Sequence, residues 1–198
     1  MLKVIPTHFG RLEDLRTDNT TNKNTDQLGY TDAAVNLHTD QPFIENPPQL
    51  QLLHCLIPAQ DGGDNFVVNG VKAAEYLKSV NPIAFKLLTE TKVKFHRKQK
   101  QFESIQIRPI ISLDENGAIK QFRYSYFTYA PHVLDFDLMT PYYQAYNEFA
   151  NLVRDKKHQY YFKLSAGDFV LYDNHKMLHA RTQFSGTRWL RGIYFDYE

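Results

Sequence analysis

Short apolar runs divided by turn-forming residues make up most of this chain, and they constrain its fold more than any other feature. Such runs favour β-strands, because glycine, proline, asparagine and aspartate interrupt them at close intervals. Two regions have helical spacing instead. The first contains two short helices separated by Asn81-Pro82, and the second begins at Thr140-Pro141. The strands are expected at residues 50–57, 65–68, 92–101, 105–113, 119–129, 160–164, 169–172, 177–182 and 189–194. A mainly β chain with a few inserted helices predicts a β-sandwich or jelly roll.

The length and composition fit one globular domain spanning residues 1–198. With 198 residues, 42% of them hydrophobic and 14% aromatic, the chain can bury one sizeable core, and no linker, repeat or low-complexity tract divides it. Its 23 basic and 22 acidic residues leave a formal net charge of +1. No global attraction to nucleic acid or to an anionic membrane is therefore expected.

Cysteine content and hydropathy indicate the compartment. Cys55 is the single cysteine, so an internal disulfide is excluded, and a buried, inert thiol is the expected state. The first residues contain no apolar run long enough for a signal peptide, and no stretch approaches the length of a membrane span. These features predict a cytoplasmic protein without a nucleic-acid or membrane partner.

The segment Asn36-Leu37-His38-Thr39-Asp40 can direct two metal ligands toward one point, because side chains two residues apart share one face of a strand. His179 lies far downstream in another strand-like run and can supply a third ligand. Two imidazoles and one carboxylate on one face of an ion are typical of non-haem Fe(II) oxygenases. One alternative is a surface turn, since eight histidines make a chance H-x-D motif easy to find. Another is a zinc hydrolase, but no separate general base is apparent near these ligands.

Further segments resemble the Fe(II)/2-oxoglutarate dioxygenases of the taurine dioxygenase superfamily, and within it the gamma-butyrobetaine and trimethyllysine hydroxylases. The resembling segments occur in colinear order between residues 9 and 194 and are residues 38–48, 52–56, 62–64, 68–70, 167–174 and 178–181. The resemblance implies a double-stranded β-helix, or jelly roll, with Fe(II) on His38, Asp40 and His179. It also implies an O2-dependent hydroxylase that converts 2-oxoglutarate to succinate and hydroxylates a C–H bond of a small molecule.

The resemblance places the 2-oxoglutarate site at Arg188 and Asn65. In these enzymes an arginine shortly after the distal histidine binds the far carboxylate of 2-oxoglutarate, and a guanidinium fork suits a planar carboxylate. Arg188 stands at that place, although an exposed turn arginine is the alternative, and Arg181 and Arg191 are competing candidates. Asn65 replaces the usual threonine or serine, and its amide can donate to the same carboxylate.

The resemblance also suggests a class of substrate. Both hydroxylases hold a trimethylammonium group in a cage of aromatic side chains. Two tyrosines of that cage correspond to Tyr30 and Tyr194. The tryptophan expected after Phe9-Gly10 has no aromatic counterpart, and Glu13 or Asp14 falls in that region. We therefore expect a small amine-containing substrate that donates hydrogen bonds to a carboxylate. Ordinary core or rim packing is the alternative for the tyrosines, since the chain has 13 of them.

The family has a longer part before the Phe9-Gly10 match than this sequence has. A second functional hypothesis is therefore a non-catalytic jelly-roll binding protein that retains the metal site. The polar residues 17–26 lead toward His38 and are expected to form a lid or a solvated connector. The sequence is compatible with a homodimer.

Overall fold

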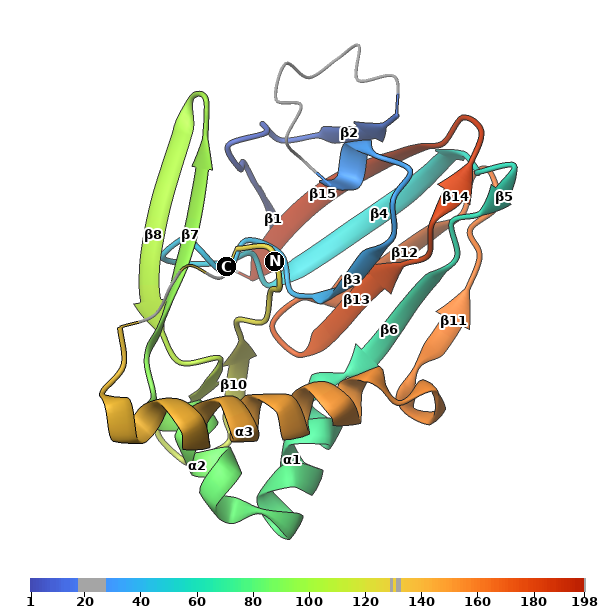
Figure 1. Cartoon of the computed structure of the whole chain (residues 1–198). Coiled ribbons are helices and arrows are strands. Elements are labelled where there is room, and N and C mark those ends of the chain that lie inside the picture. Colours follow the sequence, from blue (N-terminus) through green and yellow to red (C-terminus); the bar gives the residue numbers. More distant parts are fainter. Residues whose placement is uncertain (18–27, 129, 131–132, 198) are drawn as a thin grey trace.

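Two antiparallel sheets face each other and form a jelly roll, as the sequence predicts (Figure 1). The computed structural model describes residues 1–17, 28–128, 130 and 133–197, so the expected lid lies mostly outside the described residues. The large sheet has the order β1 (Leu2–Ile5), β15 (Trp189–Tyr197), β4 (Leu50–Ile57) and β12 (Phe169–Asp173), and β2 (Glu13–Arg16) also pairs with β15. The small sheet has the order β11 (Tyr160–Phe162), β6 (Asn65–Asn69), β13 (Met177–Arg181) and β3 (Val35–His38).

The helices pack against the small sheet and build the main core with it. These helices are α1 (Gly70–Val80), α2 (Pro82–Glu90) and α3 (Phe136–Arg154). The described residues also include two short 3-10 helices, η1 (Leu28–Tyr30) and η2 (Lys156–His158). Leu178 and Val68 of the small sheet share one buried cluster with Leu77, Leu88 and Phe149 of the helices. None of the helices among the described residues is long and apolar enough to span a membrane.

Three further strand pairs complete the chain. They are β7 (Val93–Gln99) with β8 (Phe102–Arg108), β9 (Ile111–Leu113) with β10 (Ile119–Phe122), and β5 (Asp61–Gly62) with β14 (Phe184–Ser185). In Figure 1 the β7–β8 hairpin stands to one side of both sheets. Gly62 has a positive φ of 68°, and a Cβ atom there would lie 2.2 Å from the carbonyl oxygen of Gln183. A glycine is therefore required where β5 meets the segment that leads to Arg188.

The predicted helices on either side of Asn81-Pro82 are confirmed, and the predicted start of the third helix is wrong. Asn69 and Asn81 cap α1 and α2 through their side chains, and Pro82 occupies the first turn of α2. However, α3 begins at Phe136, one turn before the expected Thr140-Pro141. The N–H groups of residues 138 and 139 bond to the carbonyl of residue 135, so a helical turn forms ahead of the proline.

The strands predicted at residues 105–113 and 119–129 differ from the observed ones. The first is divided between β8 and β9, and the second ends at Phe122. Beyond Phe122, the N–H of Tyr124 donates to Thr39 Oγ1 at 3.0 Å, and the N–H of Thr39 donates to the carbonyl of Tyr124 at 2.7 Å. This segment therefore supports the residues between His38 and Asp40 instead of continuing its own hairpin.

Candidate metal centre and cosubstrate cavity

A β-bulge orients His38 toward the space between the two sheets. His179 of β13 pairs with His38, whereas Arg181 pairs with Val35, so β3 contains one more residue than β13 between these pairs. The carbonyl oxygen of Asn36, inside the bulge, lies 2.8 Å from His38 Nδ1. This contact suits a proton on Nδ1 and leaves the Nε2 lone pair available as a ligand.

Asp40 lies just beyond the end of β3, not within an extended strand as predicted, and Asn174 holds it there. The N–H of Asp40 donates to Asn174 Oδ1 at 2.7 Å. In return, Asn174 Nδ2 donates to the carbonyl oxygens of Asp40 at 3.2 Å and Pro48 at 2.9 Å. Because Asn174 is only 1% exposed, water cannot readily replace these bonds.

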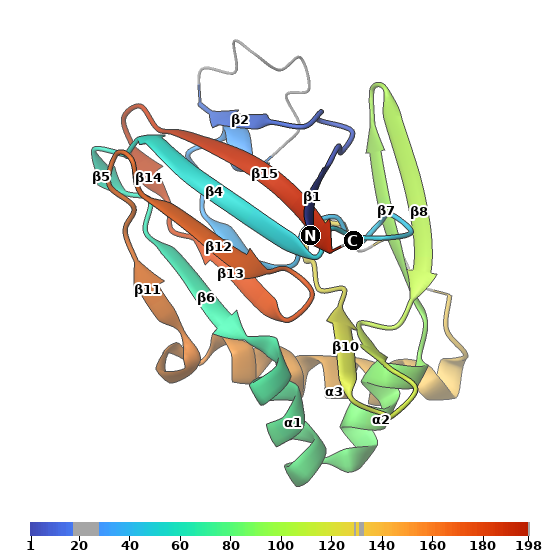
Figure 2. The same cartoon turned by 180° about the vertical axis from the view of Figure 1, so that it is seen from behind.

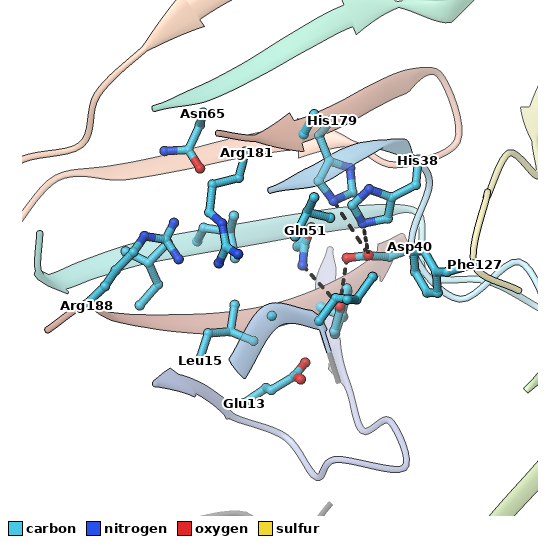
Figure 3. Close-up of a pocket in the computed structure, with 17 residues that line it drawn as sticks. Glu13, Leu15, His38, Asp40, Gln51, Asn65, Phe127, His179, Arg181 and Arg188 are labelled. Atoms are coloured by element: carbon cyan, nitrogen blue, oxygen red, sulfur yellow. Dashed lines mark hydrogen bonds and ion pairs between the residues drawn. The ribbon is translucent and has the colours of Figure 1, made fainter. Parts of the chain in front are cut away.

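His38, Asp40 and His179 converge on one point (Figure 3). Asp40 Oδ1 lies 3.3 Å from His38 Nε2 and 3.6 Å from His179 Nε2, and the ligand atoms all lie within 4.8 Å of one another. Donor atoms about 2.1 Å from one ion, at right angles to each other, are about 3 Å apart. The arrangement therefore fits one ion on the face of the triad.

The protonation states of the triad also suit a metal ion. Burial alone would raise the pKa of Asp40, but the neighbouring His179 and His38 hold that pKa well below its usual range. Burial and the nearby His38 lower the pKa of His179, against the opposing effect of Asp40. An ionised carboxylate beside a neutral imidazole is the form that binds a metal ion. Two imidazoles and a carboxylate fit Fe(II) well, and they leave coordination positions for other ligands.

A chain of hydrogen bonds fixes the second oxygen of the Asp40 carboxylate. Tyr194 donates to Asp40 Oδ2 at 2.8 Å, Gln51 Nε2 donates to the Tyr194 oxygen at 3.0 Å, and Tyr172 donates to Gln51 Oε1. Burial and the carboxylates of Asp40 and Glu13 raise the pKa of Tyr194, so its hydroxyl keeps the proton that it donates. Sequence reasoning missed Gln51 and Tyr172; their inward positions on β4 and β12 are the signal that could have identified them.

A cavity of about 90 Å³ opens beside the triad between the two sheets. Arg188 and Asn65 both line it, as the sequence predicts for a cosubstrate site. Arg188 is 6% exposed, and no described residue forms a hydrogen bond or an ion pair with its guanidinium. Burial and the nearby Arg181 lower the pKa of Arg188 to about 9, although Cys55 opposes that shift. The guanidinium carbon of Arg188 lies 5.4 Å from the centre of the Phe184 ring, and an anionic ligand would stabilise such a buried cation further.

The two competing arginines have other partners. Arg181 also lines the cavity, but it donates to the carbonyl oxygens of Thr31 and Ala33. Arg191 faces away from the cavity and donates to Asp14 Oδ1 at 2.9 Å. Trp189 Nε1 donates to the same oxygen at 2.8 Å. Of the three arginines, Arg188 is the one that a cosubstrate carboxylate can pair with most directly.

The predicted substrate residues lie around the same cavity. Glu13 and Tyr194 line it, and Tyr30 donates to Glu13 Oε1 at 3.1 Å. Both tyrosines are buried, at 4% and 5% exposure, and each uses its hydroxyl to bind a carboxylate. Asp14 is not among the cavity residues, because β2 directs it toward Arg191. Phe127 lines the cavity beside His38, with ring centroids 5.5 Å apart, and sequence reasoning did not identify it.

Comparison with known proteins agrees with this geometry. The family model described as taurine catabolism dioxygenase TauD, TfdA family, matches residues 3–194. The chain belongs to this TauD/TfdA dioxygenase family. A gamma-butyrobetaine dioxygenase from Pseudomonas sp. (strain AK-1) is 36% identical over 192 residues, which are 96% of this chain and 49% of that protein. A trimethyllysine dioxygenase from Meyerozyma guilliermondii is 29% identical over 203 residues, covering 99% of this chain and 49% of that protein.

A solved oxygenase structure confirms the fold. Asparagine oxygenase in complex with Fe(II), 2S,3S-3-hydroxyasparagine and succinate superposes with a TM-score of 0.71 at 16% sequence identity. The match covers 93% of this chain and 56% of that chain. The chain spans about half the length of the curated family members it matches.

Proposed function

We propose that residues 1–198 form one Fe(II)- and 2-oxoglutarate-dependent hydroxylase domain that acts on a small, amine-containing substrate. The observation that carries the proposal is the convergence of His38, Asp40 and His179 beside a cavity that also holds the buried cation of Arg188. Membership of a dioxygenase family supports it further.

His38, Asp40 and His179 would hold the iron, and their neighbours keep them in place. Fe(II), when bound, supplies the chemistry that couples conversion of 2-oxoglutarate and O2 to succinate and CO2 with hydroxylation of a C–H bond. The hydrogen bonds between Asn174 and the Asp40 backbone form a clamp on that residue, and the hydrogen bond from Tyr194 fixes its carboxylate, so that Asp40 keeps one orientation. The two sheets and Phe127 line the cavity and would limit the access of water to a reactive site.

Arg188 and Asn65 would bind the far carboxylate of 2-oxoglutarate. The guanidinium can donate two parallel hydrogen bonds to a planar carboxylate, and the amide of Asn65 can donate a third. Asn65 is 7% exposed, so both groups would meet the carboxylate away from bulk water. Tyr30, Tyr194 and Glu13 would contact the substrate, since they lie around the same cavity or hydrogen-bond to a residue that does.

Succinate release tests this proposal against a non-catalytic binding protein, which the dioxygenase relatives do not favour. The purified chain is incubated with Fe(II), 2-oxoglutarate and ascorbate, in air and under argon. A hydroxylase forms succinate slowly in air even without substrate and forms none under argon. Succinate formation equal to that of the His38→Ala/His179→Ala double variant would reject the proposal.

We also propose that two copies of the chain associate through the outer face of the large sheet. No helix crosses this face in Figure 2. It presents an apolar band that runs across four paired strands and is formed by Val4, Phe195, Ile193, Leu52 and Leu171. Val4 on β1 is 39% exposed and Leu171 on β12 is 46% exposed, so the band leaves aliphatic side chains accessible at both edge strands of this sheet.

Light scattering after size exclusion tests the homodimer. The expected mass is twice the 23.2 kDa of one chain. Leu171→Glu should return the mass to that of one chain, whereas Leu113→Glu, at a position of similar exposure on β9, should not. A wild-type chain that is monomeric at high micromolar concentration would reject this assembly.

A cytoplasmic location is part of the same proposal. It is supported by the free Cys55 thiol and by the need to keep iron as Fe(II), both of which suit a reducing compartment. Fractionation of cells that carry the chain at its natural level tests it, and recovery outside the cytoplasm would reject it.

A further inference from the structure

Glu13 is a buried carboxyl group inside the cavity, and no described cationic residue forms an ion pair with it. Its side chain is 4% exposed, and it lines the cavity together with the apolar residues Leu15, Leu28 and Leu53. Burying a carboxylate in such surroundings is costly unless a cation or several hydrogen bonds compensate it. The residue is not one of the three groups that converge on the metal position.

The backbone of the large sheet directs Glu13 into the cavity. Glu13 lies opposite Gly192 of β15, and a Cβ atom at position 192 would lie 3.9 Å from the Glu13 Cβ. Because Gly192 has no side chain, none lies beside Glu13 at this position of β15. Its neighbour Asp14 points to the other face of β2 and pairs with Arg191.

The hydrogen bonding of Glu13 leaves one of its oxygens available. Tyr30 donates to Oε1 at 3.1 Å, and no described residue donates to Oε2. A carboxylate can accept about four hydrogen bonds, so Oε2 retains its capacity for a donor that enters the cavity. Tyr30 also fixes the direction of the carboxyl plane.

The electrostatic environment of Glu13 favours a cationic ligand. Burial, and to a smaller extent Asp40 across the cavity, raise the pKa of Glu13 to about 8, although the hydrogen bond from Tyr30 opposes the shift. A carboxyl group that is costly to ionise in the empty cavity is relieved when a cation binds beside it. In Figure 3, Arg188 lies toward one end of the cavity and Glu13 lies below its middle.

We propose that Glu13 and Tyr30 form an amine-recognition subsite that selects a protonated amine with at least one N–H over a quaternary ammonium. This inference deepens the proposed function and depends on it for the identity of the site. A protonated amine donates a short, charge-assisted hydrogen bond to Oε2. A trimethylammonium group has no N–H, and its methyl groups hold its charge away from the carboxylate.

Binding measurements with two matched series of amines test the subsite. The probes are lysine, Nε-dimethyllysine and Nε-trimethyllysine, and gamma-aminobutyrate, its N,N-dimethyl derivative and gamma-butyrobetaine. Calorimetry under argon with Fe(II) and 2-oxoglutarate should show, in at least one series, tighter binding of the two N–H amines than of the quaternary one. Glu13→Gln should weaken the N–H amines by about 10- to 100-fold and leave the quaternary amine within about threefold.

Two control variants separate recognition from folding. Glu13→Asp keeps the charge and should retain part of the preference for N–H amines. Asp14→Asn removes the adjacent carboxylate, which binds Arg191 outside the cavity, and should leave the preference unchanged. Equal effects of Asp14→Asn and Glu13→Gln would overturn the inference.

Failure of this inference can be distinguished from failure of the proposed function. Binding of 2-oxoglutarate to the Fe(II) protein is measured in the same samples, and amine binding is repeated on metal-free protein. Two results would overturn the subsite alone, provided that 2-oxoglutarate still binds. One is tighter binding of the quaternary amine than of the N–H amines. The other is that no N–H amine binds in either series. Loss of 2-oxoglutarate binding in the wild-type chain rejects the proposed function, while amine selectivity on metal-free protein would still support the subsite.

Discussion

Glu13 and Arg188 are a buried acid and a buried base in one cavity, yet neither has an oppositely charged partner among the described residues. Their exposures are 4% and 6%, so solvent screens neither charge well. Each lowers the stability of the empty protein, and each becomes favourable when a ligand of the opposite charge binds. Stability and binding at these two residues can therefore be measured separately.

Glu13→Gln should stabilise the metal-free protein in a pH-dependent way. The pKa of Glu13 is raised from 4.5 to about 8 on folding, so between these pH values the unfolded chain releases a proton that the folded protein retains. The stability contributed by this group is complete below pH ~4.5 and falls as the pH rises toward ~8. Urea unfolding should show Glu13→Gln more stable by roughly 1 to 4 kcal/mol at pH 8 and similar to wild type near pH 4.5. The same difference at both pH values would contradict this assignment.

Arg188→Ala should weaken 2-oxoglutarate binding by two to three orders of magnitude while Fe(II) still binds. Loss of one partner from a buried ion pair costs about 3 to 5 kcal/mol. Arg191→Ala is the matched control, because that arginine pairs with Asp14 on the outer face. Calorimetry under argon measures both, and a larger loss in Arg191→Ala would show that the wrong arginine is assigned.

At the scale of elements, the turn between β12 and β13 determines where the metal ligands lie. It places Asn174 against the backbone of Asp40 and Pro48, two segments more than 120 residues away in sequence. The same turn leads into β13, which carries His179. One turn therefore aligns the H-x-D motif, which carries His38 and Asp40, with the strand that carries His179.

Asn174→Ala should reduce Fe(II) affinity about 10- to 100-fold, because it removes the clamp but none of the three ligands. It should also cost about 1 to 3 kcal/mol of stability, since buried backbone groups lose their partners. Asn116→Ala, in the exposed turn between β9 and β10, is the control. Unchanged Fe(II) affinity in Asn174→Ala would show that Asp40 is positioned by other contacts.

Periodicity predicted the elements better than it predicted their ends. Asn81-Pro82 correctly marks a helix start, but Thr140-Pro141 does not, because Asp135 allows a turn to form before the proline. Strand β2 was not expected from the short sequence Glu-Asp-Leu-Arg, which also does not say whether Glu13 or Asp14 faces inward. Pairing with β15 decides that point.

At the scale of the whole molecule, the site depends on bringing together residues that lie far apart along the chain. The H-x-D motif and the distal histidine could be predicted from residue chemistry and resemblance. The bulge in β3, the clamp by Asn174 and the hydroxyl of Tyr194 on Asp40 could not, because each arises from contacts across the two sheets. Those contacts convert a short motif into a rigid metal position.

An anaerobic titration of the Fe(II) protein with 2-oxoglutarate tests the central claim most directly. Wild type should develop the visible metal-to-ligand charge-transfer band of a chelated 2-oxo acid. His179→Ala should develop no such band, and Arg188→Ala should develop it only at 2-oxoglutarate concentrations about 100- to 1,000-fold higher. A folded wild-type chain that binds Fe(II) but gives no band at saturating 2-oxoglutarate would contradict the account.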